Sequence, residues 1–279
     1  MGLRISTNIA SQAVQKNLRK VSTDSDAQME KLSSGKRITK AADDAAGLGI
    51  STNLEAQTRG LRQATRNASD GISLVQTAEG GLNEISNIMV RLRELTIQAA
   101  SDTVGDNERG FLDKEYQQLV TEVDRISAST VFNGNSLLSG ESGGGGTMDF
   151  QVGAFEGEQN VIQFDAEATD ASAEAIGVAG TTLSTKDDAL SAIDTIDGGI
   201  NQVIGLRSNL GSIQSRLQST VSNLEVQTIN QDSARSKIQD VDIADSSAKL
   251  ASANVLKQSA ISTLAQANQI SNSALRLIN

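Results

Sequence analysis

A heptad pattern of apolar residues runs through residues 50–92, and no proline interrupts it. One line of this pattern consists of Leu54, Leu61, Ala68, Val75, Leu82 and Met89. Apolar residues at alternating three- and four-residue spacings form one stripe along an α-helix. The pattern lasts about six heptads, which is typical of a coiled-coil-like seam. A helix over residues 44–100 would be roughly 85 Å long, too long for a compact globular domain of this size.

Composition limits the chemistry available to the chain. The absence of Pro removes the usual helix breaker. The absence of Cys excludes disulfides and thiolate metal sites, and the absence of His removes the commonest general base and neutral metal ligand. With one Tyr, five Phe and no Trp, burial must come from Leu, Ile, Val and Ala. These features disfavour an enzyme, and we expect no cofactor and no metal site.

Other periodic segments flank a less regular middle. After the turn-like residues 101–110, a second helical stripe is formed by Leu112, Tyr116, Leu119, Val123 and Ile126. Short apolar stretches around Phe150 and Ile162 predict a β-hairpin near 148–165. Helical periodicity returns after the start signal Ser184-Thr185, with Ile196, Val203, Leu210, Leu217 and Leu224 one heptad apart. The predicted fold is mainly α, a long antiparallel coiled-coil-like helical bundle with a small β-hairpin region.

The two ends of the chain carry similar helical stripes, and we expect these to pair with each other. The predicted pairing residues are Leu3, Val14, Leu18, Val21, Leu250, Leu264 and Ile278. Both ends are rich in Ser, Gln and Asn, so the helices should be marginal in an isolated monomer and should order among many copies. We expect residues 1–43 and 240–279 to form an inner domain of paired terminal helices. Residues 44–239 should then form an outer helical rod.

Charge is distributed unevenly along a chain whose formal net charge is −10. Residues 1–40 contain eight basic and three acidic side chains, whereas residues 141–200 contain twelve acidic side chains and one basic one, Lys186. The acidic segment should face solvent. Nucleic-acid binding is disfavoured because no basic surface with interspersed aromatic residues is apparent. No run of about 18 apolar residues is present, so we expect no membrane span and no Sec signal peptide.

The stretch "LSSGKRITKAADDAAGLGI" at residues 32–50 raises the question of a phosphate-binding loop. That motif needs Gly five residues before Gly35 and a hydroxyl residue after Lys36, but the sequence has Glu30 and Arg37 there. A helix–helix joint therefore fits better, with the pair Asp43-Asp44 favouring the start of a helix. Likewise, residues 140–144 match a nucleophile-elbow pattern only formally, because no His is present, and we interpret them as a flexible linker.

Several segments together resemble bacterial flagellin. They include "MGLRISTNIAS", "KLSSGKRITKAADDAAGLGIS", "RGLRQATRNASDGISLVQTAEGGLNEI", "RLRELTIQAASDT", "TVFNG", "FQVGA" and "DIADSSAKLASANVLKQSAISTLAQANQ". The resemblance covers nearly the whole chain in order, and it implies that residues 32–50 join an inner coiled-coil domain to an outer helical domain. Only about 55 residues separate Gly134 from the returning helix, so the large variable outer domains of many flagellins are absent. The hook–filament junction protein of the same superfamily is the alternative, and "AADDAAGL" favours flagellin over it.

This resemblance implies a subunit that is exported by the flagellar type III apparatus and polymerises into the filament used for swimming. Its implied partners are further copies of itself, an export chaperone, the filament cap protein and the hook–filament junction protein. Some flagellins also engage Toll-like receptor 5. The stretch matching that contact carries Arg91 and Leu95, and Glu115 follows on the next helix. These three residues are therefore candidates for a subunit interface or a receptor contact.

Overall fold

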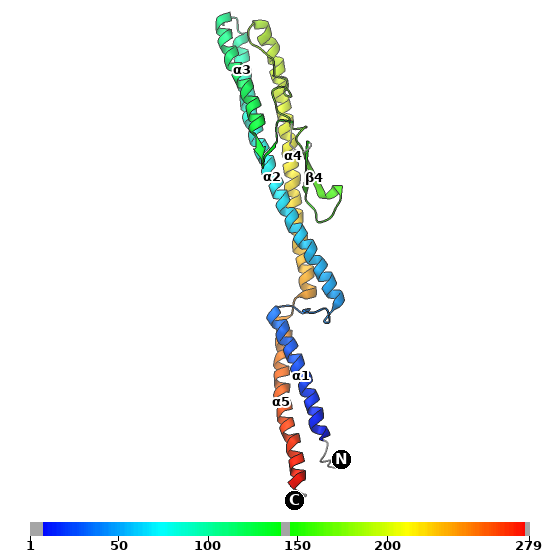
Figure 1. The fold of residues 1–279 in the computed structure, drawn as a ribbon. Helices are drawn as coiled ribbons and strands as arrows, with labels where there is room; N and C mark the ends of the chain where they lie inside the picture. The colour runs from blue at the N-terminus through cyan, green and yellow to red at the C-terminus, as the bar shows by residue number, and fades with distance from the viewer. Residues whose placement is uncertain (1–7, 141–145, 277–279) are drawn as a thin grey trace. The chain divides into compact units, whose positions relative to one another are not determined.

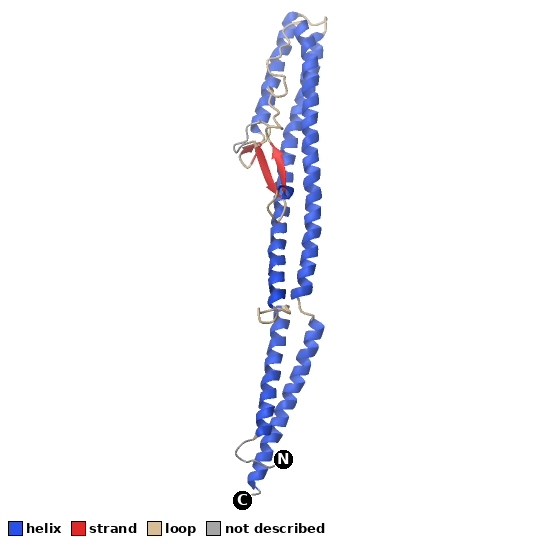
Figure 2. Cartoon of the chain, turned by 90° about the vertical axis from the view of Figure 1, so that its right-hand side faces the viewer, coloured by secondary structure: helices blue, strands red, loops and turns tan. Residues whose placement is uncertain are grey.

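The computed structural model describes residues 8–140 and 146–276, with five long helices and two short β-hairpins (Figures 1 and 2). The helices are α1 (Ile9–Ser34), α2 (Ala45–Ala100), α3 (Asp106–Ser129), α4 (Lys186–Gln239) and α5 (Ile243–Arg276). The strands are β1 (Val131–Phe132), β2 (Asn135–Ser136), β3 (Thr147–Gln151) and β4 (Val161–Asp165), with a 3₁₀ turn at Glu158–Asn160. This architecture confirms the mainly α fold with a small β region.

The chain divides into two compact units. The terminal unit contains Met1–Ala56 and Asn230–Asn279, and the central unit contains Gln57–Ile229. The sequence analysis places the boundaries at residues 43/44 and 239/240, and the two compact units divide at 56/57 on α2 and at 229/230 on α4. Between residues 230 and 239 no side chain is buried, so this end of α4 lacks the core that defines the central unit.

The central unit has a continuous apolar core formed by α2, α3, α4 and the segments between them. Leu82, Met89, Ile196 and Leu210, all on the predicted heptad stripes, are completely buried, and so is Leu92. Gly199 on α4 allows close packing, because a Cβ there would lie 2.7 Å from both the Met89 Cε atom and the Ile176 Cγ2 atom. The predicted stripes therefore form the seams of the bundle, and a glycine admits the thioether between two helices.

A buried arginine closes the turn between α2 and α3. The Arg109 Nε atom donates to the Ala99 carbonyl at 2.8 Å, and its Nη2 atom donates to the Ser101 carbonyl at 3.1 Å. Asp106 pairs with the remaining edge of the guanidinium at 2.8 Å. The last carbonyls of a helix have no partner within the helix. Arg109 therefore caps the end of α2 from the first turns of α3.

The two hairpins differ in how well the sequence indicated them. In the predicted one, β3 pairs antiparallel with β4, so that Phe150 lies opposite Ile162. The other hairpin, at the motif "FNG", was not predicted. Asn133 and Gly134 have φ values of 51° and 85°, which turn β1 back onto β2 in a two-residue loop. Two successive positive φ angles are typical of a tight hairpin turn that favours Asn-Gly.

The irregular segment between β4 and α4 lies against α3. Ala171, Ala173, Val178 and Leu183 are completely buried, although no regular element contains them. Two carboxylates on α3 satisfy backbone amides of this segment: Asp124 accepts from Ala173 at 2.7 Å and Asp113 accepts from Leu183 at 2.8 Å. Such buried amides need acceptors when no ladder supplies them. α4 then begins at the predicted signal, where the Thr185 hydroxyl accepts from the Asp188 amide.

Candidate interaction surfaces

The helices α1 and α5 of the terminal unit form an antiparallel pair (Figure 1). Of the predicted pairing residues, Val14, Leu18, Val21, Leu250 and Leu264 are half-buried in this pair, whereas Leu3 and Ile278 lie outside the described residues. The least exposed positions of the pair are instead small: Ser11, Ser25, Ser246, Ala253 and Ala267. The predicted stripe is therefore present, but polar and small side chains occupy the centre of the seam.

Large apolar side chains remain exposed on both helices of the pair. They are Ile9, Met29, Ile243, Val255, Leu256 and Ile261, each with at least half of its surface accessible. Val255 is 65% exposed and Ile261 is 52% exposed. Isolated exposed apolar residues are common, but clusters of them mark interaction surfaces. The terminal unit thus presents apolar surface that its own two helices do not cover.

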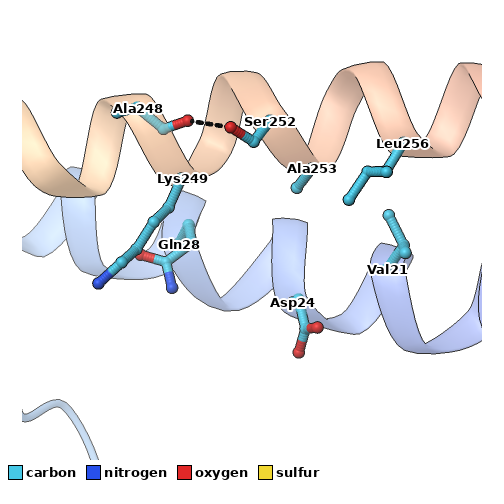
Figure 3. A pocket seen from close by; sticks show the side chains of 8 residues that line it. All are labelled: Val21, Asp24, Gln28, Ala248, Lys249, Ser252, Ala253 and Leu256. Carbon is cyan, nitrogen blue, oxygen red and sulfur yellow. Dashed lines mark hydrogen bonds between the residues drawn. The ribbon is translucent and has the colours of Figure 1, made fainter.

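A groove of about 400 Å³ follows one flank of the α1/α5 pair (Figure 3). Val21 on α1 and Leu256 on α5 point toward each other at one end of it, beside Ala253. Lys249 and Gln28 line the other end. The Lys249 ammonium also pairs with Asp245 one helical turn away, at 2.6 Å. The lining of the groove is therefore apolar at one end and polar at the other.

The joint at residues 35–44 is fastened to the connection between α4 and α5. Gly35 ends α1 in a left-handed conformation, with φ of 69°. The Arg37 amide donates to the Gln239 carbonyl at 2.7 Å, and the Val241 amide donates to the Gly35 carbonyl at 3.0 Å. The Arg37 side chain adds two bonds to the Ile238 carbonyl, the shorter at 2.6 Å. Arg37 therefore caps the C-terminal end of α4, which lies about 200 residues later in the chain.

The two acidic residues of the joint have separate roles. Asp44 precedes α2, and its Oδ1 atom accepts from the Gly47 amide at 2.8 Å, as expected of an N-cap. Asp43 accepts from the backbone amides of Thr39 and Lys40 and from the Thr39 hydroxyl. These hydrogen bonds, led by those from the backbone, hold the pKa of Asp43 below its usual value. The prediction of helix capping is confirmed for Asp44, whereas Asp43 stabilises the preceding turn.

Arg91 and Glu115 lie together on the surface of the central unit. The Arg91 Nη2 atom is 2.8 Å from Glu115 on α3, and its Nη1 atom is 3.0 Å from Glu94 on α2. Hydrogen bonds with Glu115 and then Glu94 raise the pKa of the guanidinium. Leu95 is placed differently, because it is only 1% exposed and belongs to the core. A partner that approaches this surface can therefore touch Arg91 and Glu115, but not Leu95.

A second ion pair extends from α2 to α4. The Arg93 Nε atom lies 2.6 Å from Asp197. Its hydrogen bond and charge keep the pKa of Asp197 below its usual value. Neighbouring arginines of α2 thus reach opposite sides, Arg91 toward α3 and Arg93 toward α4. Because both pairs are exposed, each contributes little to stability by itself.

Neither a metal site nor a membrane span is found in the part of the chain that the structure describes. No group of three or more Asp or Glu side chains there is arranged to hold a metal ion. Among the same residues, no helix contains an apolar stretch long enough to cross a bilayer. The features left to explain are the interaction surfaces.

Comparison with known proteins decides the family. The model of the bacterial flagellin N-terminal helical region matches residues 5–142, and that of the bacterial flagellin C-terminal helical region matches residues 193–278. A flagellin of Halalkalibacterium halodurans is 44% identical over 250 residues, which is 90% of each chain. The chain belongs to the flagellin family. It is therefore a structural subunit of a bacterial flagellar filament.

Two further flagellar proteins extend this comparison. A flagellar filament core protein of Brachyspira hyodysenteriae is 38% identical over 286 aligned positions, covering 98% of this chain and 99% of its own. The crystal structure of Bacillus cereus flagellin is 31% identical, with a TM-score of 0.50, and covers 57% of this chain and 88% of that one. These matches support the filament subunit, and they give no support to the alternative of a hook–filament junction protein.

Sequence reasoning missed two features of this flagellin. The first is the hydrogen bonding of Arg37 to the end of α4, because nothing local in "GKRI" reveals a carbonyl so distant in sequence. The second is the polar centre of the α1/α5 seam. Ser11 and Ser25 stand two heptads apart in the N-terminal stripe, and this spacing was a signal that could have been read.

Proposed function

We propose that the protein polymerises through its terminal unit, whose helices pack against those of neighbouring copies to form the inner core of the filament. The central unit then forms the outer rod. The observation that carries this proposal is the contrast in burial. Val255, Leu256 and Ile261 expose apolar surface on α5, and Ile9 and Met29 do so on α1. Packing against further copies would remove that surface from water, which is favourable at about 25 cal/mol per Å².

Removing α5 tests the proposal. A chain that ends at Asp242 loses Leu250 and Leu264 and leaves α1 without its partner, but it keeps every core residue of the central unit. We expect a soluble, helical protein that forms no filaments in electron micrographs. A triple variant, Val255→Ser, Leu256→Ser and Ile261→Ser, keeps the helix and removes only its exposed apolar side chains. Filaments of normal width from either protein would contradict the proposal.

Membership of the flagellin family suggests export and assembly partners. We propose that the chain leaves the cell unfolded through the flagellar type III apparatus, with an export chaperone holding α5 until then. The cap protein would direct its addition to a filament that begins at the hook–filament junction protein. The lack of Pro and Cys supports this route, since neither prolyl isomerisation nor disulfide pairing can slow folding at the growing end. Loss of chaperone binding on deletion of 243–279 would be the measurable outcome.

Recognition by Toll-like receptor 5 is a second proposed function, and it rests on the exposed Arg91–Glu115 pair. Leu95 would act only indirectly, by packing beneath this surface. Arg91→Ala should lower receptor signalling, whereas Arg93→Ala is the matched control. Both arginines are similarly exposed and ion-paired, but Arg93 faces α4. Equal loss of signalling from the two variants would argue against a specific role for Arg91.

We propose that the subunit has no enzymatic activity. Support comes from its lack of His and Cys, which removes the usual general base and the thiolate nucleophile. Purified filaments should therefore not hydrolyse peptide or ester substrates. Activity that co-purifies with the filaments and disappears after substitution of one acidic or hydroxyl residue would contradict this.

A further inference from the structure

The seam between α1 and α5 contains two hydrogen-bonded polar layers. The Ser11 hydroxyl donates to the Asn268 side-chain oxygen at 3.0 Å, and the Ser25 hydroxyl donates to the Asn254 side-chain oxygen at 3.5 Å. Both serines are buried, with Ser25 only 3% exposed, whereas their partners Asn254 and Asn268 are exposed at the edge of the seam. A buried hydroxyl without a partner is costly, whereas a paired one adds only modest stability. The two layers therefore have more effect on which residues of α1 and α5 pair than on the free energy of association of the two helices.

Both layers belong to a single antiparallel register. Moving two heptads along α1, from Ser11 to Ser25, corresponds to moving two heptads back along α5, from Asn268 to Asn254. Halfway between them, the same heptad arithmetic puts Leu18 at the level of Ile261, a side chain that is 52% exposed. Three successive levels of this register therefore match in polarity. The two outer levels each combine a serine with an asparagine, and the middle level combines two apolar residues.

A shift by one heptad in either direction destroys this matching. Asn254 would then lie opposite Leu18 or Leu32 instead of Ser25. Ile261 would lie opposite Ser11 or Ser25 instead of Leu18. Heptad shifts preserve an ordinary apolar stripe, so only residues that break the stripe can exclude them. A polar residue within a coiled-coil seam is known to specify register while reducing stability.

We infer that the Ser11–Asn268 and Ser25–Asn254 layers fix the register in which α1 and α5 pair. This inference rests on the proposed role of the terminal unit in polymerisation, since neighbouring copies can pack regularly only if each presents the same register. The exposed apolar residues then fall at the same levels in every copy. Neighbouring copies then supply most of the stability of the terminal unit, and the two polar layers set the register of α1 against α5.

Disulfide cross-linking can read the register, because the natural chain has no cysteine. Val21 and Leu256 point toward each other across the groove (Figure 3), so Val21→Cys with Leu256→Cys reports the native register. Val21→Cys with Lys249→Cys, or with Thr263→Cys, reports a shift of one heptad in either direction. Each pair is placed in the full-length chain and oxidised both as monomer and as polymer.

The test compares these reporters in three backgrounds. With the natural layers, the native pair should cross-link about tenfold more than either shifted pair. Asn254→Leu should reduce that ratio to about threefold or less, because the leucine packs well against Leu18 or Leu32. Exchanging the layer, with Ser25→Asn and Asn254→Ser, should restore it. Ser259→Leu adds the same apolar bulk at an exposed position off the seam and should leave the ratio unchanged.

Two results would overturn the inference. One is a native-only pattern that persists after Asn254→Leu together with Asn268→Leu. The other is equal cross-linking of all three pairs in the natural background, in both monomer and polymer. Register is read from the disulfides and polymerisation from electron micrographs, so the register inference and the proposed function can fail separately.

Discussion

In the central unit the fully buried side chains include large ones such as Leu82, Met89 and Tyr116, whereas on α1 the buried side chains are Ser11 and Ser25. Both units are built from long heptad-patterned helices. One uses the pattern to enclose a core of its own, and the other leaves its apolar residues at the rim of a polar seam. A heptad stripe therefore predicts a helix and a packing face, but not whether the chain itself supplies the partner.

The difference has a physical origin in the number of packing neighbours. α2 is covered by α3, α4, the β3–β4 hairpin and the buried segment before α4. α1 has only α5. A pair of helices can cover only one side of each member, so large apolar residues elsewhere on them stay in water. Stability of the terminal unit must then come largely from other molecules.

Hydrogen exchange should show the largest difference between the units. In the free chain, amides of α1 and α5 should exchange with opening free energies of about 0 kcal/mol, whereas those around Leu82 should approach the global value. In the polymer both sets should be protected. Mass spectrometry of peptides from the two forms measures this directly. Equal protection of α1 in monomer and polymer would remove the contrast.

Truncating core side chains should sharpen the contrast. Leu82→Ala removes a completely buried side chain and should lower the free energy of unfolding by about 2–5 kcal/mol. Ile261→Ala removes a side chain that is about half exposed and should leave the unfolding of the free chain almost unchanged. Urea denaturation of monomers gives the first comparison, and the critical concentration for polymerisation gives the second. Ile261→Ala should raise the critical concentration for polymerisation and leave the urea denaturation of the monomer unchanged.

Arg91→Ala tests whether the surface of the central unit supports its fold. Because the guanidinium is exposed, the thermal midpoint of the monomer should change little. Subunit contacts should weaken, together with receptor signalling if this flagellin is recognised. Calorimetry alongside Leu82→Ala provides the scale. If both variants melted alike, Arg91 would be a fold residue and not an interaction residue.

The smallest effect concerns pH. Arg93 lowers the pKa of Asp197, so the folded carboxylate holds its proton less tightly than the unfolded one. That contribution is complete above the ordinary Asp pKa of about 3.9. It is lost as pH falls through the lowered folded value. Asp197→Asn should therefore flatten the dependence of the melting midpoint on pH as pH falls through the ordinary Asp pKa and below it. High salt should reduce the difference between the two proteins.

The sequence was sufficient for features that depend on periodicity and local turn chemistry. The stripe from Leu54 to Met89 predicted α2, Thr185 marked the start of α4, and Asp44 marked the start of α2. Contacts between segments far apart in the sequence could not be predicted in this way. Arg37 contacts the end of α4 only when two segments about 200 residues apart come together at the joint. The sequence alone does not reveal this contact.

Burial of individual site residues was also beyond local pattern. Arg91 and Leu95 are four residues apart on one helix, which suggested a shared surface. The structure places Arg91 outside, paired with Glu115, and Leu95 inside, in the core of the central unit. Which side of a helix its neighbours cover depends on their placement in three dimensions.

The hydrogen bonds of the joint affect how two weakly attractive helices find each other. Gly35 and Val241 hold the end of α1 next to the start of α5, although some 200 residues separate them along the chain. Once those bonds form, closing the α1/α5 pair no longer costs the entropy of a long loop. Tethered partners meet at an effective concentration of about millimolar. The α1/α5 seam can therefore form even though it is too polar to hold two separate helices together, because the joint already keeps one end of each helix next to the other.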